Sequence, residues 1–200
     1  MPRGHLPYNY GMALSLRKAT PSDYRETVAV LSEAMETLSK EAALSETDRD
    51  RFFASVPALL EDGLVYLAIE NHRPVGVATV SRGVEDAFFP RSCSFRKSND
   101  LLDAIGHSGE PLLVLTGIYV VGKRQNQKIG TDILHLLIGR YPKSTWILWN
   151  REANVKATRF FLRNSFLALN EKVDVECDSL PAVVLYRKYR PSGLCREAFW

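Results

Sequence analysis

The sequence predicts a single mixed α/β domain, and three observations support that class. The chain has 200 residues, a length typical of one domain with a sizeable core. Apolar residues make up 46% and charged residues 24% of it, which is ordinary globular usage and excludes wholesale disorder or a fibrous repeat. Strand and helix periodicities alternate along the chain, so helices are expected to cross between neighbouring strands in its second half.

The expected domain covers residues 13–190. A loose leader rich in Gly, Pro and Tyr precedes it at 1–12, and a tail follows at 191–200. Residues 83–111 break the pattern and form a long insert between the third and fourth expected strands. Inserts of this length are usually functional lids or disordered segments. We expect its aromatic stretch, Phe88 to Pro90, to line the side where a second substrate enters.

Charge and cysteine content exclude several classes of partner. Lys and Arg number 26 against 23 Asp and Glu, an excess too small and scattered to demand nucleic acid or an anionic membrane. Three distant cysteines without C-x-x-C spacing argue against a disulfide framework and a structural zinc site, so no metal is expected. Without a long apolar run or a signal-peptide pattern, the chain is expected to be cytoplasmic, with no membrane partner.

The elements are expected in the order strand, two helices, hairpin, insert, and then strands and helices in alternation. Thr20 to Asp23 begins the first helix, since it offers a hydroxyl cap, a proline and a carboxylate, and apolar residues from Tyr24 to Leu38 recur at helical spacing. Pro57 is expected to kink or split the second helix, which begins after Ser45. The expected strands are 13–18, 64–69, 74–80 and 111–121, then 145–149, 167–175 and 182–189; the later helices are 99–105, 129–141 and 153–164.

The strand at 111–121 is the most apolar in the chain, and Gly117 inside it signals a bulge or a close approach. After it, a basic turn leads into the helix that begins at Ile129. Such a junction presents unpaired backbone N–H groups and the positive end of a helix dipole. Because Lys123, Arg124 and Lys128 surround the helix start, the turn suits a pyrophosphate. A solvated loop with incidental basic residues is the alternative. Rossmann and P-loop signatures are absent from the sequence.

These residues resemble a known family. The run Ile118-Tyr119-Val120, followed by Gln125-Asn126-Gln127-Lys128-Ile129-Gly130, is similar to the central strand and the Q/R-x-x-G-x-G/A signature of the GNAT superfamily of acyl-CoA-dependent N-acyltransferases. Asn154, Ala157, Phe160-Phe161 and Ser165-Phe166 resemble its N-x-x-A-x-x-F-Y-x-x-x-G-F segment. Outside the insert, the element order from Leu14 to Tyr189 fits the GNAT fold.

The resemblance implies a site for acetyl-CoA, or another acyl-CoA, in a gap where the strands at 111–121 and 145–149 splay apart. Strand backbone and loop amides would bind the pantetheine arm and the pyrophosphate. The residues implied are Ile118, Tyr119, Val120, Gln125, Asn126, Gln127, Lys128, Ile129, Gly130, Thr131, Asn154 and Phe161. The implied acceptor is a primary amine of a small molecule or peptide, which attacks directly in a ternary complex. Both a monomer and a homodimer remain open.

Three residues depart from the family pattern. Lys128 replaces the first Gly of the signature, and a left-handed backbone there costs on the order of 1 kcal/mol. Phe161 stands where many relatives carry the tyrosine that protonates the departing thiolate, and Ser165 replaces a Gly. The alternative proton donors are Tyr186, Tyr119 and water, and the candidate general bases are Glu110, Glu85 and Asp86. The alternative function is a weak or inactive member that binds CoA or acyl-CoA as a sensor or scaffold.

Overall fold

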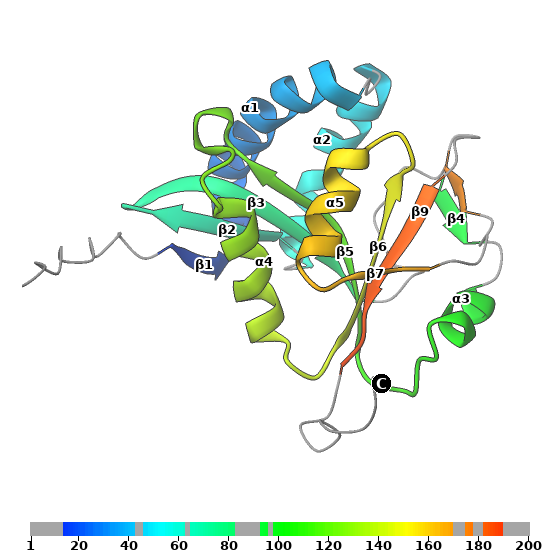
Figure 1. The fold of residues 1–200 in the computed structure, drawn as a ribbon. Helices are drawn as coiled ribbons and strands as arrows, with labels where there is room; N and C mark the ends of the chain where they lie inside the picture. The colour runs from blue at the N-terminus through cyan, green and yellow to red at the C-terminus, as the bar shows by residue number, and fades with distance from the viewer. Residues whose placement is uncertain are drawn as a thin grey trace, which may run out of the picture.

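A seven-stranded mixed sheet organises the molecule, with helices on both faces (Figure 1). The computed structural model describes residues 14–42, 46–62, 65–82, 93–95, 98–169, 175–177 and 182–189. The strands of the sheet, in spatial order, are β1 Ser15–Lys18, β2 Val65–Glu70, β3 Arg73–Ser81, β5 Leu112–Val120, β6 Thr145–Arg151, β9 Ala182–Arg187 and β7 Leu167–Ala168. The helices are α1 Tyr24–Ala42, α2 Glu46–Glu61, α3 Ser98–Ala104, α4 Ile129–Arg140 and α5 Val155–Arg163, with short 3-10 turns η1 Pro21–Asp23 and η2 Gly122–Arg124. The predicted mixed α/β class is confirmed.

The elements follow the predicted order along the chain, but the single strand expected at 167–175 is wrong: β7 and β8 Val175–Cys177 are two short strands in different sheets. Neighbouring strands are antiparallel except for β5 and β6, which are parallel and joined through α4. The predicted hairpin is β2–β3. Its two-residue turn holds Asn71 and His72 at φ 53° and 62°, the conformation that matches the twist of adjacent antiparallel strands.

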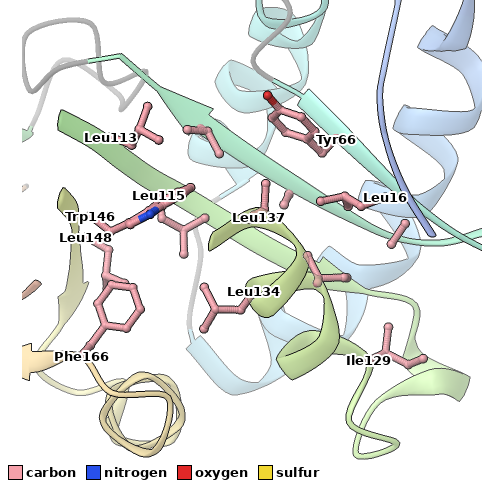
Figure 2. Packing of buried hydrophobic residues seen from close by; sticks show 14 of the residues in the cluster. Leu16, Tyr66, Leu113, Leu115, Ile129, Leu134, Leu137, Trp146, Leu148 and Phe166 are labelled. Atoms are coloured by element: carbon pink, nitrogen blue, oxygen red, sulfur yellow. The ribbon is translucent and has the colours of Figure 1, made fainter. Parts of the chain in front are cut away.

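Alternating side chains divide the core between the two faces of the sheet. One face carries the largest apolar cluster, which includes Leu134 and Leu137 of α4, Leu115 of β5 and Trp146 of β6 (Figure 2). Phe160 and Phe161 of α5 pack against the edge of this cluster. The opposite face is covered by α1 and α2 at one side and by α3 at the other. The sheet is therefore the middle layer of three.

Two details of the first helices differ from the sequence expectation. Tyr24 is 41% exposed, because the buried face of α1 runs through Thr27, Val30 and Leu31 instead. Of the two outcomes expected at Pro57, a kink or a split of the second helix, the split is wrong, since α2 continues through Pro57 to Glu61. Its neighbours Val56, Leu59 and Leu60 are buried against the sheet, and this burial offsets the hydrogen bond that a proline removes.

The described part of the insert holds β4 Cys93–Phe95 and α3. The helix expected over 99–105 is confirmed, and Gly106 ends it at φ 57°. Strand β4 pairs with β8 Val175–Cys177 in a separate two-stranded sheet, in which Cys93 lies opposite Cys177. Glu85, Asp86 and the stretch Phe88 to Pro90 lie outside the described residues. No described helix is long and apolar enough to cross a membrane.

Candidate functional site

The central strands β5 and β6 separate along most of their length. Their parallel pairing covers Leu112, Leu113 and Val114 of β5, and no later pair between the two strands occurs in the described residues. Strand β5 nevertheless continues to Val120, held by β3, and β6 continues to Arg151, held by β9. The predicted splay is confirmed. It leaves the β6-facing edge of β5 open from Leu115 onward.

A bulge marks the start of this open edge. Thr79 pairs with Gly117 and Val80 with Leu115, so Thr116 is one extra residue in β5. Its hydroxyl donates to the Thr79 hydroxyl at 2.6 Å. The extra residue reverses the alternation of side chains: Leu115 and Ile118 contact the α4 face, whereas Tyr119 packs on the α1–α2 face.

Gly117 permits the close approach that the sequence signalled. A Cβ atom at this position would lie 2.4 Å from the ring of Tyr119. The ring therefore folds back over the strand, and Phe52 of α2 contacts it at a centroid distance of 5.7 Å. Burial raises the pKa of Tyr119 to about 12. The phenol is protonated at neutral pH, as any tyrosine is, and burial makes it a weaker acid than an exposed one.

The turn between β5 and α4 carries a row of unpaired backbone donors. In the described part of the chain, the N–H groups of residues 126 to 131 donate to no backbone or side-chain acceptor. Asn126 and Lys128 adopt left-handed conformations at φ 62° and 66°, and left-handed residues that alternate with others are typical of the backbone nests that bind anions. No side chain caps α4, which leaves its positive end open. Lys128 therefore meets the condition under which a residue other than Gly is strained at this position.

Hydrogen bonds hold this turn in place before any ligand binds. Gln125 donates its backbone N–H to Gly122 O at 3.2 Å and its side-chain amide to Val120 O at 3.2 Å. Gln127 donates its side-chain amide to Lys123 O at 3.1 Å. The N–H of Gln125, which the sequence included among the pyrophosphate donors, is thus already used within the turn. The donors available to an anion begin at Asn126.

One basic residue of the turn is paired. Arg124 Nη2 donates to Oε2 of Glu70, the last residue of β2. Arg124 Nε is buried, with no partner in the described residues. Lys123 and Lys128 are exposed. Of the three cations that the sequence placed around the helix start, Arg124 is therefore neutralised locally.

Helix α5 closes the α4 side of the gap. A Cβ at Gly130 would lie 3.7 Å from the Phe160 ring and 3.9 Å from Val120, so the α4 start, the β5 end and α5 converge there. Asn154 caps α5 by accepting from the Ala157 N–H at 3.1 Å. Its carbonyl accepts from Asn150 at 2.9 Å. The structure thus gives Asn154 a helix-capping role; its contact with pantetheine remains a prediction.

Phe161 has a structural role at the end of α5. Ser165 adopts φ 67°, its N–H donates to Leu162 O, and the Phe166 N–H donates to Phe161 O at 3.2 Å. This is a Schellman ending, and the accompanying apolar contact joins the Phe161 and Phe166 rings at 5.5 Å. The motif residues at 161, 165 and 166 therefore form one helix-terminating unit, in which Phe161 offers no proton.

The remaining candidates lie at the paired end of the sheet. Tyr186 pairs with Ile147, which pairs in turn with Val114, so its register is five residues before Tyr119 on β5. Glu110 precedes β5 and accepts hydrogen bonds from Thr145 and from Ser108. The structure does not bring these candidates together with Tyr119.

The environment of Glu110 lowers its basicity. Burial, the largest single influence, would raise its pKa, but the hydrogen bonds from Thr145, from its own backbone and from Ser108 outweigh it and lower the pKa to about 2. The carboxylate is therefore ionised and fully engaged at neutral pH. These are the properties of a structural acceptor, which is a poor general base.

The sequence did not reveal Glu70 or Thr116. Glu70 is separated from Arg124 by 54 residues, and their contact depends on the hairpin register and on the exit of β5 beside β3. The apolar run around Gly117 signalled a bulge without fixing which residue is extra. Because the residues on both sides of Gly117 are nearly all apolar, no alternation of polar and apolar side chains marks the extra residue.

Solved structures share this architecture. An acetyltransferase of the GNAT family from Streptococcus agalactiae matches with TM-score 0.65 at 16% identity, over 91% of this chain and 98% of its own. One from Listeria monocytogenes matches with TM-score 0.64 at 12% identity, over 89% and 96%. The PaiA N-acetyltransferase from Thermoplasma acidophilum, solved in complex with coenzyme A, matches with TM-score 0.60 at 13% identity, over 89% and 100%. No family model matches the sequence, and no curated protein matches it. At these identities the likeness establishes the fold.

Proposed function

We propose that this chain, which has the GNAT fold, is an N-acyltransferase that uses acetyl-CoA and transfers its acyl group to a primary amine. One observation carries the proposal: a row of unpaired amides, residues 126 to 131, lies directly beyond the open edge of β5. The amides and the α4 dipole suit a diphosphate, and the open strand edge suits an extended amide-containing arm. Together they fit a coenzyme A thioester.

The open edge of β5 also serves the chemistry. A thioester supplies an activated acyl group, and attack by an amine places negative charge on its carbonyl oxygen. Backbone N–H groups along the edge from Ile118 to Val120 are fixed donors that stabilise such charge without reorganisation. As the carbon–nitrogen bond forms and the carbon–sulfur bond breaks, the sulfur needs one proton and the new amide loses one.

Tyr119 is the proton donor in this proposal. It lies on the stretch of β5 beyond its pairing with β6 and carries a proton at neutral pH, although burial raises its pKa to about 12 and so makes it a weaker acid. Phe161 has no proton to give, and Tyr186 lies at the paired end of the sheet. Replacing Tyr119 with Phe removes the donor. A further Phe161→Tyr change in the same chain supplies a replacement hydroxyl at position 161.

The choice of amine is part of the test. Freeing a lysine amine at pH 7 costs about 4.6 kcal/mol, whereas an α-amine costs only about 1 kcal/mol. The described carboxylate nearest in sequence to β5, Glu110, is a poor base. We therefore expect amines of low pKa to be better acceptors than lysine side chains.

The experiment measures thiol release from acetyl-CoA with a panel of amines that spans this pKa range, alongside calorimetry with CoA. The proposal expects CoA binding and amine-dependent thiol release, with Tyr119→Phe reducing turnover by about 10- to 100-fold and leaving CoA affinity unchanged. If turnover recovers in the double variant Tyr119→Phe/Phe161→Tyr, the defect of Tyr119→Phe is the loss of a proton donor. An unchanged rate in Tyr119→Phe contradicts its role.

A second function is favoured by Phe161, whose ring is part of the helix-terminating unit of α5. In that case the chain binds CoA or acyl-CoA as a sensor or scaffold and transfers nothing. Calorimetric heat with CoA, together with thiol release no faster than the blank for every amine, identifies this function. Absence of heat with CoA contradicts both functions.

A further inference from the structure

A half-buried ion pair links the β2–β3 hairpin to the turn of unpaired amides. Glu70 ends β2 directly before the left-handed pair Asn71 and His72. Its carboxylate accepts from Arg124 Nη2, and the two side chains are only 17% and 35% exposed. The two partners are 54 residues apart. The contact thus joins two loops that the sheet brings to the same edge.

The backbone around the pair is also tied down. The Val121 N–H donates to Val75 O at 3.1 Å, where β5 leaves the sheet, and the Arg124 N–H donates to Val121 O at 2.8 Å. Arg124 ends η2, and the row of unpaired amides begins two residues later at Asn126. Fixing Arg124 therefore fixes the entrance to the nest.

The pair is arranged in a way that stability alone does not explain. Arg124 Nε is buried with no partner in the described residues, and such a group opposes folding. Glu70 also places a negative charge beside a site suited to an anion, which by itself weakens anion binding. Both costs are consistent with a role in ordering the turn before the anion arrives, because preorganisation increases affinity.

We propose that Glu70 is a positioning residue for the phosphate-binding turn: through Arg124 it anchors η2 to the hairpin, so that the amides of residues 126 to 131 converge before CoA binds. The inference rests on the proposed CoA site. It assigns Arg124 to the scaffold of the turn, and it leaves direct phosphate contact to the backbone amides and the exposed lysines.

The direction in which one substitution changes the affinity for CoA tests this role. Glu70→Gln removes a negative charge near the anion site, and charge alone would strengthen CoA binding. Loss of positioning has the opposite effect, and we expect the Kd for CoA to rise between about threefold and tenfold. In the reaction, the KM for acetyl-CoA should rise while kcat stays unchanged, because Glu70 does not contact the reacting atoms.

Asp132→Asn is the matched control. Asp132 is exposed in the first turn of α4, so the change removes the same charge near the same amides without touching the pair. We expect it to tighten CoA binding slightly. Arg124→Gln should weaken binding as much as Glu70→Gln, and the double variant should be no weaker than either single one, since both remove a single link.

The outcomes are distinct. Glu70→Gln that binds CoA as tightly as the wild type, or more tightly, overturns the inference. Arg124→Gln that weakens binding while Glu70→Gln strengthens it shows that Arg124 contacts the phosphate itself, and also overturns it. Thermal unfolding checks each variant; if Glu70→Gln is unfolded, Glu70→Asp, which keeps the charge but shortens the reach, must weaken binding. A wild-type chain that binds no CoA refutes the proposed function instead.

Discussion

The two ends of β5 belong to one strand but differ in what surrounds them. Its first residues, Leu112 to Val114, pair with β6, and Val114 also pairs with Ser81 of β3. Its last residues, Ile118 to Val120, pair only with β3 in the described part of the chain and are half-buried. We infer from this difference that the paired end of β5 contributes to stability, whereas its open end is available for binding. Changes at the two ends should therefore have separable effects.

The largest expected effect is at the paired end. Trp146 is fully buried in the main cluster, so Trp146→Ala should lower the free energy of unfolding by about 3 to 5 kcal/mol, as measured by urea denaturation. CoA affinity of the folded fraction should not change. Trp146→Phe is the control and should cost much less, since it fills most of the volume and removes an Nε1–H that has no partner among the described residues. A loss of CoA affinity in the folded Ala variant contradicts the separation.

Glu110 gives the paired end a dependence on pH. Its pKa is lowered from 4.5 to about 2, so its contribution is fully present above pH 4.5 and is lost as the pH falls towards 2. We expect wild type to exceed Glu110→Gln in unfolding free energy by roughly 1 to 3 kcal/mol at pH 7. The difference should shrink below pH 4.5. A difference that stays constant from pH 7 to pH 3 would mean that the carboxylate is not stabilised in this way.

At the open end, Gly130→Asp should act on binding rather than on folding. A carboxylate beside the first amides of α4 repels a diphosphate, and we expect CoA affinity to fall at least about tenfold, or about 1.4 kcal/mol. A Cβ at this position meets only ordinary contacts, 3.7 Å or longer, so Gly130→Ala controls for its size. Calorimetry with CoA compares the two. Equal affinity in both variants would place the diphosphate elsewhere.

The smallest effect concerns two left-handed residues. Lys128→Gly and Ser165→Gly each relieve a positive φ, of 66° and 67°, and each should raise the unfolding free energy by on the order of 1 kcal/mol. Of the two residues, only Lys128 lies in the row of amides. Loss of its positive charge should therefore weaken CoA binding about two- to fivefold, whereas Ser165→Gly should leave the affinity unchanged. An equal effect of both on binding would remove Lys128 from the site.

Local patterns predicted the parts of the site that depend on short stretches of chain. The turn after the apolar strand and the start of α4 at Ile129 follow from strand and helix signals within a few residues. The motif also marked Lys128 as a position that is strained if it is left-handed, and the structure shows that it is. Because these features depend on nearby residues, sequence reasoning reaches them.

Long-range features lay beyond the sequence. The contact of Glu70 with Arg124 needs the register of three strands, and the pairing of β4 with β8 joins short segments in the insert and near the chain's end. Pro57 was expected to interrupt its helix, yet α2 is continuous because burial of its neighbours outweighs a local propensity. In each case, packing between distant segments determined the outcome.

The bulge at Thr116 shapes the path of β5 without deciding which side chains face which layer. Leu115 and Gly117 already pair with adjacent residues of β3, so a strand without Thr116 would alternate regularly and would keep Ile118 and Val120 towards α4 and Tyr119 towards α1 and α2. What the extra residue adds is a local bend and a stronger twist. It lies directly after Val114, the last residue of β5 that pairs with β6, so its removal would straighten the strand at the point where the two strands part.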